Sequence, residues 1–208
     1  LDPKVPYDPL KDFIAVGHAV MVDLMMVARK DLSANTLAQA IALARGNPAK
    51  ITFASGGSGT SGHLLIEYLR SVVGADFVHV PHNGDAPALN ALMGGHVDYA
   101  ILSMPGAQVQ AKAGTIRPVV VTGKARSRAF PDVPTLAESG HGAFQGGTWG
   151  GLHVPAGTAA AIVERLNTTL NAALRDPALQ EQIAGLGMSP AGGTPREYEE
   201  FIAREMQQ

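Results

Sequence analysis

The 208-residue sequence contains no cysteine, which excludes a disulfide framework, a thiolate nucleophile and a cysteine-ligated metal. Charge is scarce as well, because charged residues make up only 16% of the chain and the formal net charge is −2. Without a basic excess there is no global field to hold nucleic acid, so no nucleic-acid partner is expected. The one small basic cluster, formed by Lys124, Arg126 and Arg128, is interpreted as a solvated turn.

Long hydrophobic runs are missing too. The nearest candidate, residues 15–28, contains His18 and Asp23 and falls short of the roughly 18 apolar residues of a membrane helix. Hydrophobic residues nevertheless make up 46% of the chain, which argues against disorder, since a disordered chain combines low hydrophobicity with high charge. A folded domain without a membrane span is expected.

Glycine and proline are plentiful, with 24 and 14 residues, and they separate short apolar runs from helical stretches. Strands are predicted at residues 50–54, 77–80, 97–102 and 116–122, and helices at 63–73, 86–93 and 105–113. Strand–helix alternation of this kind predicts an α/β fold with a parallel sheet and right-handed crossovers.

The flanking segments differ in character. Before the alternation we predict a loop, a strand over 18–27 and a helix over 36–45; after it we predict a strand over 148–154 and then mostly helix. Capping signals mark the starts of the three C-terminal helices. These signals are Thr158 for a helix that runs to about Leu174, Asp176 before Pro177, and a Thr194–Glu197 capping box.

The richest local signal is the glycine-rich turn at residues 55–62 (SGGSGTSG), between a predicted strand and a predicted helix. Its glycines let the backbone approach a ligand closely, and the following helix offers free N–H groups with a partial positive charge. The turn is therefore interpreted as an uncharged cradle for a carboxylate or phosphate. The expected contacts are the hydroxyls of Ser55, Ser58, Thr60 and Ser61 and the amides at Gly57 and Gly59.

One alternative is an α/β enzyme that uses the same turn for a phosphate or a dinucleotide. Gly57, Gly59 and Gly62 match the dinucleotide fingerprint. That fingerprint requires an acidic residue at the end of the next strand, whereas residues 78–83 (VHVPHN) contain none and Asp85 lies beyond them. A nicotinamide cofactor is therefore not expected.

Other catalytic patterns are missing from the sequence. No Gly-Lys-Ser/Thr ending completes a P-loop, and no Gly-x-Ser-x-Gly elbow surrounds Ser58 or Ser61. His79 and His82 are three residues apart on an extended segment and should not share a face, which argues against a metal pair. For Asp98, which follows a Gly-Gly-His turn, a structural role is favoured. The sequence thus predicts no catalytic residue, cofactor or metal.

An ordered set of motifs runs along nearly the whole chain, and the set is more specific than any of its members. After residues 7–13 (YDPLKDF) and the turn at 55–61 come residues 78–81, Gly84, 87–89, 94–98, 112–114, 126–127, 131–135, 138–140 and Trp149. In this order they resemble the extracytoplasmic solute receptors of tripartite tricarboxylate transporters, also called the Bug family.

The resemblance implies a two-lobed periplasmic binding protein of type II-like architecture, with parallel sheets joined by crossover strands. Residues 29–122 would form the second lobe. Residues 1–28 and the mainly helical residues 123–208 would form the first lobe, which is incomplete. It implies a non-enzymatic, periplasmic receptor that captures a small carboxylate (a di- or tricarboxylate, an amino acid or an aromatic acid). The implied partners are the membrane subunits of the tripartite transporter.

The resemblance also assigns site residues. The second-lobe ligand loop corresponds to residues 55–61, where Thr60 stands in the place of the family's usual serine. His82 stands where the family pattern usually has tyrosine, and Asn83 where arginine or lysine is frequent; His82 would add a hydrogen-bond donor. Ser103 and Trp149 occupy family positions near the cleft.

The resemblance leaves one part of the family pattern unmatched. In the family, a βαβα segment precedes the motif at residues 7–13 and carries the first lobe's Gly-Gly ligand loop, and this sequence lacks it. We therefore expect a truncated form that binds its ligand weakly or not at all alone. Apolar surface left uncovered in the incomplete lobe would favour self-association.

Overall fold

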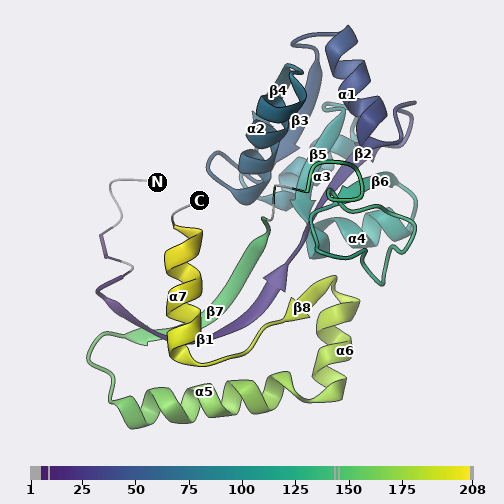
Figure 1. The fold of residues 1–208 in the computed structure, drawn as a ribbon. Helices are drawn as coiled ribbons and strands as arrows, with labels where there is room; N and C mark the ends of the chain where they lie inside the picture. The colour runs from purple at the N-terminus through teal and green to yellow at the C-terminus, as the bar shows by residue number, and fades with distance from the viewer. Residues whose placement is uncertain (1–5, 9, 143, 145, 207–208) are drawn as a thin grey trace. The chain divides into compact units, whose positions relative to one another are not determined.

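The computed structural model describes residues 6–8, 10–142, 144 and 146–206 (Figure 1). The chain divides into two compact units: unit 1 consists of Leu1–Met21 and Trp149–Gln208, and unit 2 consists of Val22–Thr148. These units divide the chain at residues other than those expected for the lobes, 29 and 122, so the lobe assignment stays a prediction.

Unit 2 is built around a five-stranded sheet with the order β4-β3-β5-β2-β6. Strand β3 pairs in parallel with β4 and β5, as the strand–helix alternation predicts, whereas β2 runs antiparallel to both β5 and β6. Strand β2 lies outside the alternation on which the prediction rests. The strands are β2 (Leu24–Arg29), β3 (Ile51–Ser55), β4 (Phe77–Pro81), β5 (Tyr99–Ser103) and β6 (Ile116–Val121).

Four helices connect and cover these strands, and their ends lie within one or two residues of the predicted ones. They are α1 (Leu37–Gly46), α2 (Ser61–Val73), α3 (Asp85–Met93) and α4 (Met104–Lys112). Thr36 forms a capping box with Gln39 at the start of α1, and Gly74 ends α2 in the left-handed conformation at φ 59°. The capping box satisfies backbone groups that a helix start leaves unpaired, and glycine adopts the left-handed conformation at the end of α2 without steric cost.

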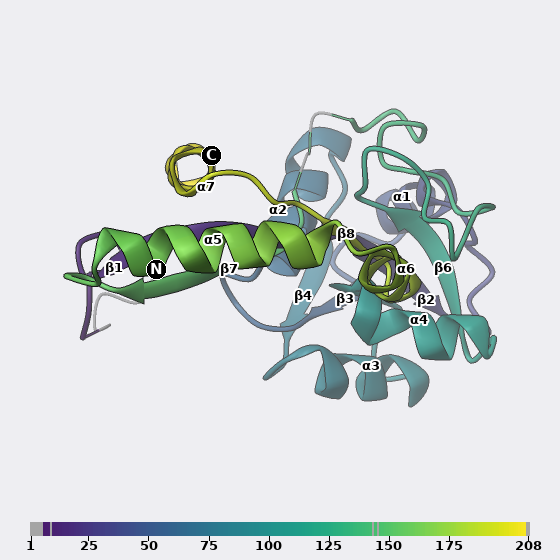
Figure 2. The same ribbon diagram turned by 90° about the horizontal axis from the view of Figure 1, so that it is seen from below.

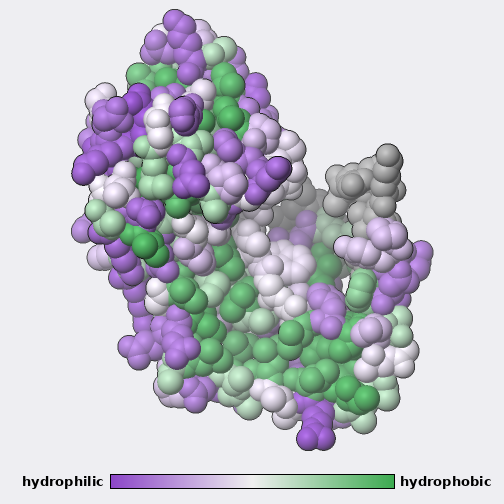
Figure 3. Space-filling view, turned by 180° about the vertical axis from the view of Figure 1, so that it is seen from behind, coloured by the Kyte–Doolittle hydropathy of each residue, from purple (hydrophilic) through white to green (hydrophobic). Residues whose placement is uncertain are grey.

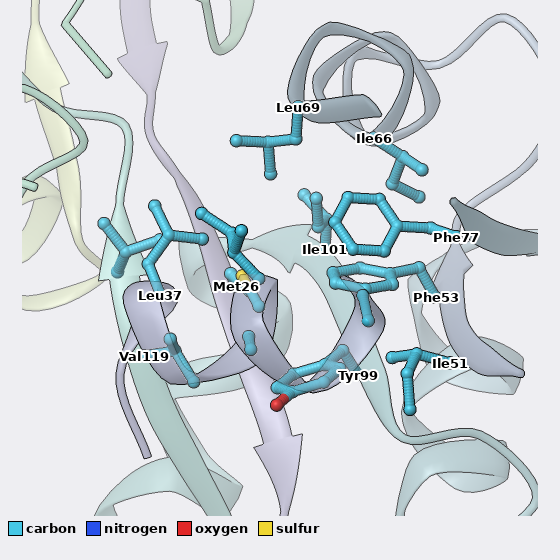
Figure 4. Close-up of a cluster of buried hydrophobic side chains, with 14 of the residues drawn as sticks. Met26, Leu37, Ile51, Phe53, Ile66, Leu69, Phe77, Tyr99, Ile101 and Val119 are labelled. Atoms are coloured by element: carbon cyan, nitrogen blue, oxygen red, sulfur yellow. The ribbon is translucent and has the colours of Figure 1, made fainter. Parts of the chain in front are cut away.

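The sheet of unit 2 is buried on both faces, because helices cover each face. Side chains alternate along each strand, so every strand contributes to both faces. Met26 and Phe53 belong to a cluster that includes side chains of α1 and α2, while Met25 and Ala54 face a cluster built with α3 and α4. Figure 2 shows these two helix layers on opposite sides of the sheet. In the first cluster the Phe53 ring stacks on Tyr99 at 4.9 Å between centroids (Figure 4).

Unit 1 contains a three-stranded sheet with the order β7-β1-β8 and three helices. The single strand predicted over 18–27 is wrong, because the chain breaks at Asp23 into two strands that belong to different sheets. The backbone carbonyl of Asp23 accepts the N–H of Met104 at 2.8 Å, in register with the β2–β5 pairing that begins at Leu24. The elements are β1 (Phe13–Val22), β7 (Thr148–Pro155), α5 (Ala160–Leu174), α6 (Pro177–Gly185), β8 (Met188–Pro190) and α7 (Pro195–Glu205).

Two of the three predicted caps in unit 1 are confirmed. Asp176 accepts the N–H of Leu179 at the start of α6, and Thr194 and Glu197 form the predicted capping box of α7. The third is wrong: α5 begins after Ala159 without a side-chain cap. The Thr158 hydroxyl instead donates to the carbonyl of Pro155 at 2.8 Å, which closes the preceding turn.

Helix α7 packs on β1 and β7 through aromatic side chains. The His18 imidazole stacks on the rings of Tyr198 and Phe201 at centroid distances of 5.2 and 4.5 Å. The Trp149 ring meets both of these α7 rings edge-on. The family resemblance places Trp149 near the cleft. In the structure its ring packs within unit 1.

Unit 1 also presents hydrophobic residues to its surface. Figure 3 shows them gathered over its sheet and helices in the lower part of the view. Side chains that are more than a third exposed include Phe13, Leu152, Ile162 and Leu166. Across the described part of the chain, no helix is both long and apolar enough to cross a bilayer.

Candidate functional site

A cavity of about 220 Å³ lies in unit 2 where the parallel strands β3 and β5 end and helices α2, α3 and α4 begin. In open α/β sheets, ligands bind at this carboxyl edge of the strands. Its lining comprises Leu24, Gly56, Thr60, Ser61, Gly62, Gly84, Asp85, Ile101, Ser103 and Thr148. Three helix N-termini therefore converge on one small cavity.

The glycine-rich turn adopts a conformation that requires its glycines. Gly57 and Gly59 have φ angles of +138° and +81°, in the region that L side chains rarely adopt. A side chain on Gly57 would in addition lie 3.1 Å from the carbonyl oxygen of His82. Thr60 fixes the turn to the helix, because its hydroxyl donates to the carbonyl of Gly57 at 2.8 Å and accepts the N–H of His63 at 3.4 Å.

The hydroxyls of Ser55 and Ser61 are engaged within the protein. The Ser55 hydroxyl is fully buried and lies 2.7 Å from Nε2 of His79 and 3.2 Å from the carbonyl oxygen of Gly57. The Ser61 hydroxyl donates to the carbonyl of Gly147 at 3.0 Å. These two side chains help to shape the turn, and backbone donors beside them remain for a ligand.

Three backbone amides supply those donors. The N–H groups of Gly56, Ser61 and Gly62 make no hydrogen bond within residues 6–8, 10–142, 144 and 146–206. Two of them belong to the first turn of α2, where the helix presents unpaired N–H groups and a partial positive charge. Such a terminus binds carboxylate or phosphate without a cationic side chain.

The structure separates the predicted site residues into two groups. Thr60, Ser61 and Ser103 line the cavity, and Ser103 also caps α4 by accepting the N–H of Gly106 at 3.3 Å. The others lie next to it without lining it, namely Ser55, Gly57, Ser58, Gly59 and His82. His82 directs Nδ1 at the carbonyl of Val80, 2.9 Å away. A ligand role for each of these residues stays a prediction.

Sequence reasoning missed Asp85, the one charged residue that lines the cavity. Its carboxylate oxygen Oδ2 accepts the backbone N–H of Ser103 at 2.9 Å and the Ser103 hydroxyl at 2.6 Å. The available signal was its position at the start of α3, directly after the Gly84 turn that follows β4. From the sequence, Asp85 was considered only as a ribose ligand.

The electrostatics of the cavity are set by neutral donors and this one carboxylate, since no lysine, arginine or histidine is among its described lining residues. Burial lowers the pKa of His79, which lies behind the turn, and the nearby His63 ring lowers it further. Burial also raises the pKa of Asp23, the residue before Leu24 of the lining. Both shifts favour neutral side chains around the site.

Other charged groups are engaged elsewhere. A second, shallow cavity contains Arg70, but its guanidinium already pairs with Glu67 at 3.0 Å and Asp76 at 3.1 Å. Arg126 of the basic cluster pairs with the Glu138 carboxylate at 2.9 Å. Within the described residues, no group of three potential ligands could hold a metal ion.

Asp98 has the structural role favoured from the sequence. Its carboxylate accepts hydrogen bonds from the backbone N–H and the hydroxyl of Thr52 at 3.0 and 2.9 Å and from Arg29 at 3.2 Å. These contacts join the amino ends of β3 and β5, at the edge of the sheet opposite the cavity.

Comparison with known proteins places these observations in a family. A family model described as the tripartite tricarboxylate transporter family receptor matches residues 1–208. Among curated proteins, a UPF0065 protein of Pseudomonas sp. strain P51 is 36% identical over 98% of this chain and 61% of its own length. Protein BugT of Bordetella pertussis is 34% identical over all of this chain and 64% of its own length. The chain thus spans about three-fifths of the length of these relatives.

Solved structures give the same result for the fold. Rpa4515 of R. palustris, determined with adipate, has a TM-score of 0.93 at 30% identity over 99% of this chain and 69% of that one. The periplasmic binding protein BugD has a TM-score of 0.87 at 30% identity, over 97% and 68%. MatC from Rhodopseudomonas palustris with bound malate has a TM-score of 0.86 at 28% identity, over 100% and 71%. The predicted fold class, a two-lobed periplasmic binding protein, is confirmed.

Proposed function

Because the chain belongs to the tripartite tricarboxylate transporter receptor family, we propose that it is an extracytoplasmic receptor that captures a small carboxylate for such a transporter. The observation that carries the proposal is the set of free amides at Gly56, Ser61 and Gly62, beside a cavity at the carboxyl edge of the strands. The adipate and malate of the two R. palustris structures support a carboxylate ligand. The proposal involves no catalytic step.

Neutral donors are sufficient for this task. A carboxylate that accepts several N–H groups makes charge-assisted hydrogen bonds, which are about twice as strong as those between neutral groups. Inside a small cavity the low local dielectric strengthens each bond further. The N-terminal turn of α2 adds the favourable end of the helix dipole. A receptor built this way can bind a carboxylate without a cationic side chain.

Isothermal titration calorimetry of the purified protein tests the proposal. The panel contains adipate, malate, aspartate and glutamate, with adipamide as the uncharged analogue of adipate. For the protein expressed from its whole gene, we expect saturable binding of at least one carboxylate and none of adipamide. NAD is included because residues 57–62 match the dinucleotide pattern. Saturable binding of NAD with no carboxylate binding would overturn the receptor in favour of the enzyme alternative.

The amides themselves are tested at Ser61, the first residue of α2. Ser61→Pro removes the N–H, while proline is well tolerated at this helix position and after the extended backbone of Thr60, with φ −74° and ψ 161°. Ser61→Ala is the matched control, since it loses the same hydroxyl and keeps the N–H. We expect carboxylate affinity to fall at least tenfold in Ser61→Pro relative to Ser61→Ala. Equal affinities would reject the α2 terminus as the anion site.

The cellular setting follows from the same proposal. The protein would act in the periplasm and hand its ligand to the membrane subunits of the transporter. In this proposal, residues 29–122 form the second lobe of the receptor. Secretion is tested by fractionating cells that express the full-length gene product. Transfer is tested by loss of carboxylate uptake when the gene is deleted, with uptake of an unrelated sugar as the control.

Self-association stays a prediction of the same kind. Its support is the group of exposed apolar side chains in unit 1, among them Phe13, Leu152, Ile162 and Leu166. Contiguous apolar surface favours contact between copies. Light scattering across a hundredfold range of concentration tests it, and a constant monomer mass would contradict it.

A further inference from the structure

We infer that Asp85 makes the cavity select ligands that carry an ammonium group beside their carboxylate, which are amino acids, over hydroxy acids and plain dicarboxylates of the same size. The inference rests on the proposed function, because it names the ligand class of the same cavity. It follows from the place of one carboxylate among neutral donors.

The Asp85 side chain is held in a fixed position. Its Oδ2 atom accepts two hydrogen bonds from Ser103, at 2.9 Å from the backbone N–H and 2.6 Å from the hydroxyl. Two glycines leave room for it, since a Cβ on Gly56 would lie 2.9 Å from Oδ1 and a Cβ on Gly106 would lie 2.9 Å from Oδ2. The carboxylate is therefore packed between the glycine-rich turn and the start of α4.

The second oxygen of this carboxylate is available. Oδ1 accepts no hydrogen bond from any residue that the structure describes, although Asp85 lines the cavity. No cation is among the described lining residues to neutralise it. A partly buried carboxylate in this position attracts a positive group and repels a negative one, more strongly than it would in water.

Both recognition elements lie within reach of one small ligand. The amides of Gly56, Ser61 and Gly62 and the carboxylate of Asp85 belong to the same cavity of about 220 Å³. A ligand whose carboxylate lies on the α2 terminus would place its neighbouring substituent beside Asp85. An ammonium group there donates to Oδ1 and gains a charge-assisted hydrogen bond, whereas a second carboxylate would meet a like charge.

Asp85 also has an ordinary structural explanation. An acidic residue in the first turn of α3 stabilises the helix dipole, and its bonds to Ser103 connect α3 with α4. That role concerns the stability of the protein and leaves ligand preference unaffected. A ratio of affinities therefore separates the two explanations.

The experiment measures the dissociation constants of two matched pairs, aspartate with malate and glutamate with 2-hydroxyglutarate. The members of each pair differ only in an ammonium or a hydroxyl group. We expect the wild-type protein to prefer the amino acid by about tenfold in at least one pair. Asp85→Asn keeps an oxygen that can accept both Ser103 bonds, and we expect it to abolish that preference. Asp132→Asn, at an exposed position outside the cavity, is the control and should retain it.

The outcomes separate this inference from the proposed function. If no carboxylate binds at all, the proposed function fails. If malate or 2-hydroxyglutarate binds as well as its amino-acid partner, the selectivity is refuted and the receptor stands. The same refutation follows if Asp85→Asn keeps the wild-type ratio. If Asp85→Asn does not fold, a wild-type protein without the preference still refutes the inference, because the ligand pairs require no variant.

Discussion

The hydroxyl of Ser55 lies 2.7 Å from Nε2 of His79, and this contact joins the buried end of β3 to β4 directly behind the glycine-rich turn. The His79 ring stacks on the ring of His63 at 4.2 Å between centroids and 14° between planes. Nδ1 of His63 accepts the N–H of Gly59 at 3.0 Å. These contacts link β3, β4 and α2 behind the turn, where burial favours the neutral form of His79.

Stability is therefore expected to fall in mild acid. Burial and then the neighbouring His63 lower the pKa of His79 in the folded protein below the ordinary value of about 6.5. Below pH 6.5 the unfolded chain binds a proton that the native protein resists, so the free energy of unfolding decreases as the pH drops toward the lowered pKa. Urea unfolding between pH 7.5 and 5 measures this slope.

Replacing the imidazole identifies its share of the effect. His79→Gln offers an amide to Ser55 and does not titrate, so its slope should be smaller than that of the wild type. The slope should not vanish, since burial also lowers the pKa of His18 and His153. The exposed His96, replaced by Gln, is the control and should keep the wild-type slope. A slope unchanged in His79→Gln would contradict the assignment. Other charged groups that act on His79 and stay in place are Glu67, Arg70 and His82.

Thr60 is expected to couple the stability of α2 to ligand affinity. Its hydroxyl caps α2 and holds the carbonyl of Gly57 at 2.8 Å. Thr60→Ala should cost about 1 kcal/mol of stability and weaken carboxylate binding, because the free amides at Ser61 and Gly62 depend on the capped geometry. Thr60→Ser keeps the hydroxyl and should restore both. Thr158→Ala, which loses a hydroxyl bonded to a turn carbonyl, should leave binding intact. Differential scanning calorimetry and titration supply the two measurements.

The alternation of strands and helices in unit 2 could be predicted from the sequence because each element there is delimited by local signals. Glycine or proline ends the helices, and apolar runs such as Tyr99–Ser103 are long enough for one strand only. The break at Asp23 could not be predicted, since residues 15–28 are apolar on both sides of it. The break becomes apparent only in the structure, where β1 and β2 pair with strands of different sheets.

For the site, the sequence located the turn but not the atoms that face the cavity. Glycine spacing predicts close backbone approach, and the turn indeed lies on the cavity edge. The hydroxyls of Ser55 and Ser61 were predicted as ligand donors, but their partners, His79 and the carbonyl of Gly147, are 24 and 86 residues away. Asp85 reaches Ser103 across 18 residues. Long-range partners of this kind cannot be derived from local spacing.

Gly62 should be intolerant of any side chain. A Cβ at this position would lie 2.9 Å from the carbonyl oxygen of Ile101, a backbone atom of β5, so α2 would have to move away from the sheet. Gly62→Ala should lower the free energy of unfolding by about 1–3 kcal/mol and weaken carboxylate binding. Gly46→Ala is the matched control, because no atom lies within 4 Å of its added Cβ and alanine favours the helix. Chemical denaturation should find Gly46→Ala at least as stable as the wild type; equal loss in both variants would contradict the close contact.

Two adjacent glycines of β7 are expected to differ in the same way. A Cβ on Gly151 would collide with the hydroxyl oxygen and the ring of Tyr198, and that side chain is 2% exposed and has no room to turn aside. Gly151→Ala should therefore displace α7 and cost about 1–3 kcal/mol. A Cβ on Gly150 meets only Val20 at an ordinary 3.6 Å, so Gly150→Ala should be nearly neutral. The sole tryptophan, Trp149, packs against the Tyr198 ring at 5.9 Å, so its fluorescence reports the change directly. Native emission should shift to longer wavelength in Gly151→Ala and stay unchanged in Gly150→Ala, and equal spectra in the two variants would refute this account of the α7 packing.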